Sequence, residues 1–320
     1  MRLSTSMIFD QQVRGISESQ SSWLKVGEQL STGRRVNNPS DDPIAASRAV
    51  VLSQAQAVSS QYGTARNFAD QSLSMEENAL SSVTTAITKA KEIVVAASTG
   101  TLNDEDRASY ATQLQGIRDQ ILGQANSRDG NGRYIFAGYK TDQPPFSDTG
   151  SAVTYVGGTE AISQKVDDSR TMNVGDTGNN VFMALTSNAK PEPDGSASEK
   201  NIFNMLDSAI ASLKVPLANA SDADIESAKN TMAKSNRGLN NALDNVLKVR
   251  SDIGTKMDEL DKLGQQSDDR KLILDSQMSN LVDVDYTAAI SSYTMKQTAL
   301  QASYKTFTDM SKMSLFQLNS

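Results

Sequence analysis

The last forty residues of this chain, 281–320, combine a helical apolar stripe with very little charge. From Tyr286 onward, apolar side chains recur at steps of four, three, seven, four and three residues, so they share one face of a helix. The stripe consists of Tyr286, Ile290, Tyr293, Leu300, Tyr304 and Phe307. From residue 286 to residue 320, the only charged residues are Lys296, Lys305, Asp309 and Lys312. Such a helix is better suited to be covered by neighbouring protein than by water.

A second seam lies near the N-terminus. Seven positions from residue 9 to residue 30 alternate steps of four and three, which is a heptad pattern, and five of them are apolar. These five are Phe9, Val13, Ile16, Trp23 and Leu30. An isolated helix of about 20 to 30 residues with few charge pairs is marginal in water, so each terminal helix needs a partner. Two interpretations remain open: docking within the chain, or completion by other copies or partner chains.

The chain contains neither cysteine nor histidine. This absence excludes disulfides, thiolate and imidazole metal sites, and the Ser-His and Cys-His nucleophile systems. Adjacent acids such as Asp41 and Asp42 diverge by about 100° on a helix, so they indicate helix starts and solvated faces rather than a catalytic pair. We therefore expect no enzymatic activity, no cofactor and no metal.

The charge balance weighs against nucleic acid and membrane as partners. The net charge is −7 and no block of lysine and arginine exists, whereas phosphate binding needs a concentrated basic face. No stretch reaches the roughly 20 apolar residues of a membrane span, and the N-terminus lacks the apolar core of a cleavable signal. The chain is expected to be cytosolic, or exported by a route that reads no cleaved signal.

Between the two seams, the sequence predicts long helices around a small β-rich insert. Gly, Asn and Pro break the first helix at 31–39, and helix resumes over 44–97. Further helices are predicted from 103, 202 and 221, the last with a heptad of apolar residues. Glycine-punctuated β-like runs fill 146–183, residues 134–139 are predicted as a strand, and 186–200 as an exposed linker.

The expected fold is mainly α with a small β-rich insert, in which the N- and C-terminal regions form a long antiparallel helical bundle or coiled coil. Three parts are expected. Residues 1–36 and 281–320 form a terminal helical domain, and residues 37–140 and 200–280 form a helical rod domain with a β-hairpin. Residues 141–199 form the small β-rich insert. The lean hydrophobic content of 38% argues against one large globular core.

Several segments together resemble the flagellin superfamily. They are the break Leu30-Ser31-Thr32-Gly33-Arg34-Arg35-Val36-Asn37, the helix start Asp41-Asp42-Pro43-Ile44-Ala45-Ala46, and Asp283-Val284-Asp285-Tyr286-Thr287-Ala288. Two more segments are similar to its hook-associated members, namely Met7-Ile8-Phe9-Asp10-Gln11-Gln12 and Asn131-Gly132-Arg133-Tyr134-Ile135-Phe136-Ala137-Gly138. The chain is shorter than typical flagellins, and its insert is small. Both features favour a hook–filament junction protein over a filament subunit.

The resemblance implies a structural role outside the cell. It implies export through the flagellar type III apparatus without a cleaved signal peptide, and an extracellular location in the bacterial flagellum. It also implies a ring of about eleven copies, with paired terminal helices as an inner tube, the long helices as a middle shell and the insert facing outward. The partners implied are hook-associated protein 1, flagellin or the filament cap protein, and an export chaperone at the C-terminal region.

The two seams are the expected assembly interface. Its residues are Phe9, Val13, Ile16, Trp23, Leu30, Ile290, Tyr293, Leu300, Tyr304 and Phe307. A fully buried side chain of this size contributes about 1.5–3 kcal/mol, so the seams add up only when they are repeated around a ring.

Three alternatives remain open beside the junction role. The first alternative is a flagellin filament subunit or a flagellin-like secreted protein. The second is a coiled-coil binding module of the cytosol. The third is an enzyme, such as an insert-borne peptidase like those of some flagellins. The absence of histidine makes the metal-peptidase version untenable.

Overall fold

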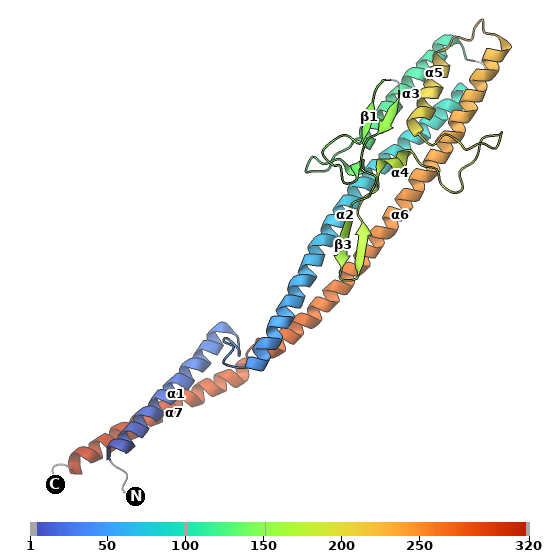
Figure 1. Ribbon diagram of the computed structural model, residues 1–320. Coiled ribbons are helices and arrows are strands. Elements are labelled where there is room, and N and C mark those ends of the chain that lie inside the picture. The colour runs from blue at the N-terminus through green and yellow to red at the C-terminus, as the bar shows by residue number, and fades with distance from the viewer. Residues whose placement is uncertain (1–4, 99–101, 151, 318–320) are drawn as a thin grey trace. The chain divides into compact units, whose positions relative to one another are not determined.

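The computed structural model describes residues 5–98, 102–150 and 152–317, and the side chains of 5, 6 and 313–317 are left aside. Over these residues the chain forms seven α-helices, one short 3₁₀ turn and two two-stranded sheets (Figure 1). The helices are α1 (Thr5–Thr32), α2 (Pro43–Ala97), α3 (Asp104–Ala125), α4 (Gly178–Phe182), α5 (Ile202–Lys214), α6 (Asp222–Val282) and α7 (Tyr286–Gln317). The expected mainly α class with a small β-rich insert is confirmed. No helix of the described part is long and apolar enough to cross a membrane.

The chain divides into two compact units, which we describe separately. The terminal unit contains residues up to 59 and from 268 onward, and the central unit contains residues 60–267. In the terminal unit, α1 and α7 lie side by side, and the start of α1 and the end of α7 lie at the same end of the pair (Figure 1). This pair is the antiparallel arrangement that the two seams predict.

Short polar side chains start the helices where the sequence predicts. Asp42 Oδ1 accepts a hydrogen bond from the Ala45 amide at 3.0 Å, directly before Pro43 opens α2. Asn103 Oδ1 accepts from the Asp106 amide at 2.7 Å at the start of α3. The Ser221 hydroxyl accepts from the Asp224 amide at 3.2 Å at the start of α6. Each of these bonds satisfies a backbone donor that has no partner inside the helix.

The core of the central unit runs along α2 and α6. The second half of α2 buries an unbroken heptad seam, with Leu73, Leu80, Val83, Ile87 and Val94 all at 0% exposure. The heptad of α6 is also buried, at Met232, Leu239, Val246, Ile253 and Leu260. Helices α3 and α5 pack against each other and contribute to the same core. A single fully buried leucine contributes about 2 kcal/mol, so the buried seams are a main source of stability for this unit.

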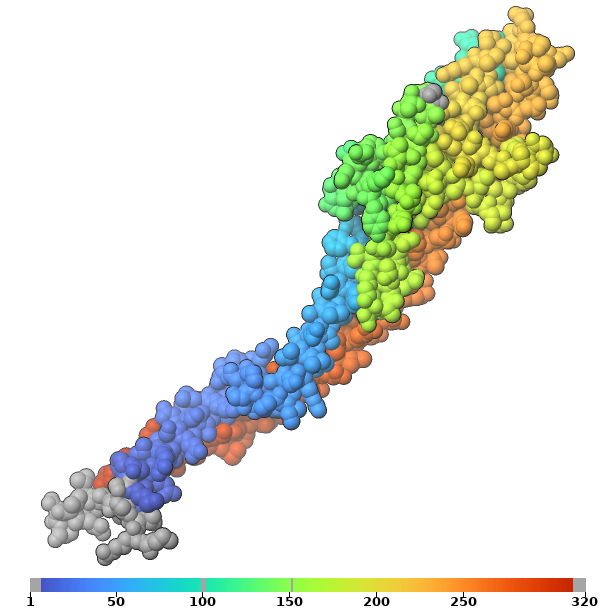
Figure 2. Space-filling model, viewed as in Figure 1, coloured from blue at the N-terminus to red at the C-terminus, as the bar shows by residue number. Residues whose placement is uncertain are grey.

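The insert is a thin layer on the helices of the central unit (Figure 2). Strand β1 (Phe146–Asp148) pairs antiparallel with β2 (Val153–Tyr155), and β3 (Ser163–Asp167) pairs antiparallel with β4 (Arg170–Asn173). One apolar side chain of each strand points inward, at Phe146, Val153, Val166 and Met172. Phe146 joins Phe136, Phe182 and Phe203 in an aromatic cluster, with ring centroids 5.3–6.3 Å apart.

The predicted strand at 134–139 was wrong. The structure has a 3₁₀ turn at Ile135–Ala137, beside an isolated bridge between Arg128 and Tyr134, so the expected β-hairpin of the rod is absent from this described segment. Residues 136, 137 and 138 are all buried, whereas a strand on helices buries alternate residues. Gly138 has φ +58, and an added Cβ would collide with the carbonyl oxygen of Glu160. This close approach turns the backbone out of the extended conformation.

The predicted linker at 186–200 lacks regular secondary structure, but it is not fully exposed. Glu192 is 8% exposed, and its Oε2 accepts a bond from Arg237 Nη2 at 2.6 Å. Asn241 of α6 exchanges two hydrogen bonds with the backbone of Lys190, at 2.9 and 3.0 Å. These bonds hold the segment on α6, and only the contacts of a folded chain can reveal them.

A buried carboxyl in the central unit carries no cation of its own. Glu76 is 0% exposed, and both of its oxygens lie 3.2 Å from the Asp176 amide. The pKa of Glu76 is raised from 4.5 to about 8, chiefly by burial and then by the nearby Asp176 charge, while Lys256 opposes the shift. As the pH rises, Glu76 loses its proton in the unfolded chain before it does so in the folded chain. The free energy of unfolding therefore falls as the pH rises from about 4.5 to about 8.

Glu76→Gln should remove this pH dependence. A glutamine keeps the acceptor oxygen for the Asp176 amide and never ionises. The free energy of unfolding of the variant should therefore exceed that of the wild type at pH 9 by on the order of 5 kcal/mol and match it closely at pH 4.5. Urea unfolding at both pH values measures the difference. The exposed Glu226→Gln is the control and should follow the wild type. Equal pH slopes in all three proteins would contradict the assignment.

Candidate assembly interface

Two aromatic contacts join α1 to α7 in the terminal unit. The rings of Phe9 and Phe307 lie 5.1 Å apart, and those of Trp23 and Tyr293 lie 5.5 Å apart. Both contacts pair a residue of one predicted seam with a residue of the other. Their order along the two helices shows that the helices run antiparallel.

Two hydrogen bonds also join the helices. Gln12 Nε2 donates to the sulfur of Met310 at 3.2 Å, and Lys296 Nζ donates to the Ser22 carbonyl at 3.5 Å. The indole nitrogen of Trp23 is buried and has no hydrogen-bond partner. The pair therefore lacks the dry, interlocked core of a complete coiled coil.

None of the ten predicted seam residues is fully buried. Six are half-buried, namely Ile16, Trp23, Leu30, Tyr293, Leu300 and Phe307. Four are 44–56% exposed, namely Phe9, Val13, Ile290 and Tyr304. In a complete coiled coil of two helices, the side chains at seam positions are normally buried. The structure thus brings the two seams together and leaves much of their apolar surface open.

The face of α1 that meets α7 is shifted from the predicted seam. The most buried residues of the pair are Val26, at 6% exposure, and Ala289, at 8%. Neither belongs to a predicted seam. On α1 the half-buried line includes Ile8, Gln12 and Ser19, one residue before the corresponding seam position in each case. A search for apolar residues misses this line because serine and glutamine occupy part of it.

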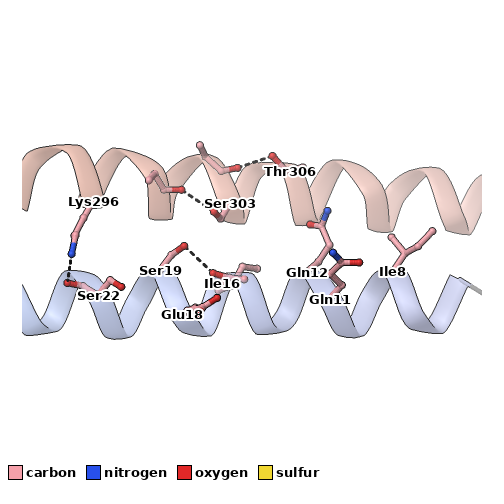
Figure 3. A pocket seen from close by; sticks show the side chains of 13 residues that line it. Ile8, Gln11, Gln12, Ile16, Glu18, Ser19, Ser22, Lys296, Ser303 and Thr306 are labelled. Atoms are coloured by element: carbon pink, nitrogen blue, oxygen red, sulfur yellow. Dashed lines mark hydrogen bonds between the residues drawn. The ribbon is translucent and has the colours of Figure 1, made fainter. Parts of the chain in front are cut away.

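A groove of about 960 Å³ runs along one side of the helix pair (Figure 3). Its walls carry larger side chains, namely Ile8, Gln11, Gln12, Ile16, Glu18, Lys296 and Thr306. Between them lie small residues, which we call the groove residues: Gly15, Ser19, Ser22, Ala299, Ala302 and Ser303. Two of their three hydroxyl groups have local acceptors, since Ser19 donates to the Gly15 carbonyl at 2.8 Å and Ser303 to the Ala299 carbonyl at 2.9 Å. Covering this groove would therefore bury few unpaired donors.

The arrangement supports binding rather than chemistry. The groove is lined by methyl, hydroxyl and amide groups with the charges of Glu18 and Lys296, and it contains no nucleophile beside a base. Across the described residues, no group of three or more potential ligands could hold a metal ion.

A second feature of the terminal unit is a backbone clasp between residues 33–36 and 281–284. The Arg35 amide donates to the Val282 carbonyl at 2.7 Å, and the Val284 amide donates to the Gly33 carbonyl at 2.9 Å. Arg35 Nη2 also donates to the Leu281 carbonyl at 2.7 Å. The clasp thus joins two segments on which the resemblance to flagellins rests.

Two carboxylates stabilise the loop that follows the clasp. Lys25 Nζ lies 2.8 Å from Asp41 Oδ1, and this hydrogen bond lowers the pKa of Asp41. The Ala45 amide and then Arg35, at 3.1 Å, lower the pKa of Asp42. The adjacent acids therefore act as cap and ion-pair partners, as expected for a helix start.

The comparisons with known proteins agree with this geometry. The N-terminal helical region of bacterial flagellin matches residues 3–141, and the C-terminal helical region matches residues 237–318. The matched regions contain both terminal helices and the clasp, so the class is that of the flagellins.

Two curated relatives narrow the class. The flagellar hook-associated protein 3 of Escherichia coli K12 is 61% identical over 319 residues, and that of Salmonella typhimurium LT2 is 59% identical over 319 residues. Each comparison covers 100% of both chains. The crystal structure of flagellar hook-associated protein 3 from Legionella pneumophila has the same fold, with a TM-score of 0.65 at 20% identity, over 72% of this chain and 98% of that one. The chain belongs to the flagellin family, in the branch of flagellar hook-associated protein 3, and is a structural component of the flagellum.

Gly33→Ala should weaken the clasp. Gly33 has φ +70, and an added Cβ would lie 2.9 Å from the Tyr286 hydroxyl, so alanine costs on the order of 1–2 kcal/mol. In a strain that lacks the gene, this variant should restore fewer filaments per cell than the wild type, counted by electron microscopy. Gly123→Ala on α3 is the control, because its Cβ meets nothing within 4 Å. A full complement of filaments with Gly33→Ala would show that the clasp is dispensable.

Proposed function

We propose that this protein joins the flagellar hook to the filament. It assembles through its terminal helices as a ring of about eleven copies, with hook-associated protein 1 on one side and flagellin or the filament cap protein on the other. The observation that carries the proposal is the exposure of Phe9, Val13, Ile290 and Tyr304, at 44–56%, on a helix pair with little charge. Apolar side chains of this size stabilise only when neighbours cover them.

The division of the chain supports separate roles for its parts. We assign residues 1–36 and 281–320 to an inner tube, residues 37–140 and 200–280 to a middle shell, and residues 141–199 to an outward-facing insert. The central unit has a buried core of its own, whereas the terminal helices leave large apolar side chains such as Phe9 and Ile290 exposed. A stable body with incomplete ends suits a subunit that mates with two unlike neighbours.

The same exposed surface supports an export chaperone as an earlier partner. Ile290, Met295 and Tyr304 of α7 are 46–65% exposed, and such a surface promotes aggregation until it is covered. The chaperone covers the C-terminal region before export through the flagellar type III apparatus, which reads no cleaved signal. The mature protein is extracellular and has no enzymatic activity or cofactor.

Deletion of the gene tests the junction role against the flagellin alternative. A junction protein makes the filament possible without forming it, so the deletion strain should still secrete flagellin, but as unpolymerised protein in the medium. Immunoblots of medium and sheared filaments measure this distribution. Loss of the filament protein itself, from cells and medium alike, would instead identify the chain as the filament subunit.

Complementation with point variants tests the assembly interface. Trp23→Ala removes the ring that packs on Tyr293, and a loss of about 1–3 kcal/mol in each copy of a ring should sharply reduce filament number. The matched control is Tyr139→Ala, which truncates a 60% exposed ring outside the terminal helices and should leave filaments intact. Equal effects of the two variants on filament number would contradict the proposal that the terminal helices form the assembly interface.

A further inference from the structure

The α1–α7 pair presents two unlike faces. One face carries the groove residues already defined. The other face carries exposed apolar side chains, which we call the ridge: Phe9, Val13 and Leu24 of α1, and Tyr286, Ile290 and Tyr304 of α7. The ridge residues are 44–56% exposed. Leu24 and Tyr286 were not among the predicted interface residues.

The helical repeat places the two faces on opposite sides of the pair. On α1, Gly15 and Ser22 lie about 40–60° to one side of Ser19, whereas the ridge residues lie about 80–140° to its other side. On α7, the groove residues lie about 40–140° to one side of Phe307, and the ridge residues lie about 60–100° to its other side. Both helices line one groove, so both parts of the ridge share the opposite side.

The chemistry of the two faces is complementary. The ridge has no charged member and presents two tyrosine hydroxyls among aliphatic and aromatic groups. Beside the larger side chains of its walls, including Glu18 and Lys296, the groove has small side chains that leave space for protruding groups. Its serine hydroxyls at positions 19 and 303 already have backbone acceptors. Protruding rings therefore fit a surface that offers depth and needs few new hydrogen bonds.

A second copy of the chain is the occupant that satisfies both faces at once. If the ridge of one copy met the ridge of another, both grooves would stay open. If a foreign helix filled the groove, the ridge would stay exposed. Association of unlike faces covers the ridge and the groove of every copy, and it closes into a ring when the rotation between copies permits.

We propose that the terminal helices assemble head to tail, with the ridge of one copy seated in the groove of the next. This inference rests on the proposed ring assembly and assigns a direction to it. Each copy then buries six apolar side chains that are about half exposed in the single chain.

Cysteine cross-linking tests the pairing, because the chain has no cysteine of its own. One set of full-length chains carries a ridge cysteine, Val13→Cys or Tyr304→Cys. The other set carries a groove cysteine, Ser19→Cys, Ser22→Cys, Ala299→Cys or Ser303→Cys. Pairs of single-cysteine chains are expressed together in the deletion strain, and isolated hook–filament junctions are oxidised. All single-cysteine chains are first scored for filaments.

Dimers should form in ridge-plus-groove mixtures, and neither ridge chains alone nor groove chains alone should cross-link. A chain with both cysteines should give a ladder of multimers. Ridge-to-ridge dimers, or filaments without any ridge–groove dimer, would overturn the head-to-tail pairing while leaving the junction role intact. Normal filaments in the deletion strain would instead overturn the junction role itself.

A second variant pair needs no cross-link. Ala299→Phe fills the groove and should leave at least tenfold fewer filaments per cell than Thr298→Phe. Residue 298 lies about 180° from Phe307 on the surface of α7. Both changes add the same bulky ring to the same helix. Equal loss of filaments with the two variants, or none with Ala299→Phe, would contradict a groove that receives the ridge.

Discussion

The contact between α1 and α7 is the interaction on which this molecule depends, and in a single chain it is incomplete. Two aromatic pairs, Phe9 with Phe307 and Trp23 with Tyr293, hold the helices together. Yet Phe9 remains 50% exposed, and the most buried positions are Val26 and Ala289. A helix pair of this length with little charge and little buried apolar surface has a small margin of stability. Its sequence therefore favours assembly over independence.

The central unit shows the contrasting solution. Its long helices α2 and α6 bury continuous heptads, and the aromatic cluster around Phe136 fixes the insert on them. Buried Arg118 there is paired with carboxylates: it is 5% exposed and lies 2.7 Å from Asp148 and 2.6 Å from Asp207. This unit meets the requirements of a self-sufficient fold, so surface left open on the terminal helices is a property of those helices.

Periodicity predicted the helices well, and the assembly interface stays a prediction. Helix starts such as Asp42 and Asn103 follow from local capping chemistry, which the sequence carries in full. The strand predicted at 134–139 failed because a buried run around Gly138 depends on the distant Glu160 carbonyl. The two seams lie on helices that contact each other, but no periodic pattern separates the side of α1 that meets α7 from the side left open. Ser19 and Ala299 were missed because small residues form a groove only in three dimensions.

Hydrogen exchange of α1 and α7, in the purified chain and in isolated junctions, tests most directly whether these helices are completed by assembly. In the single chain their amides should exchange far faster than those of α2 residues 73–94, and in the junction they should slow by roughly a hundredfold or more. Because Trp23 is the only tryptophan, its emission reports the same change at one site. Equal protection of α1 and α7 in the two states would contradict the account, because the pair would then be complete in the single chain.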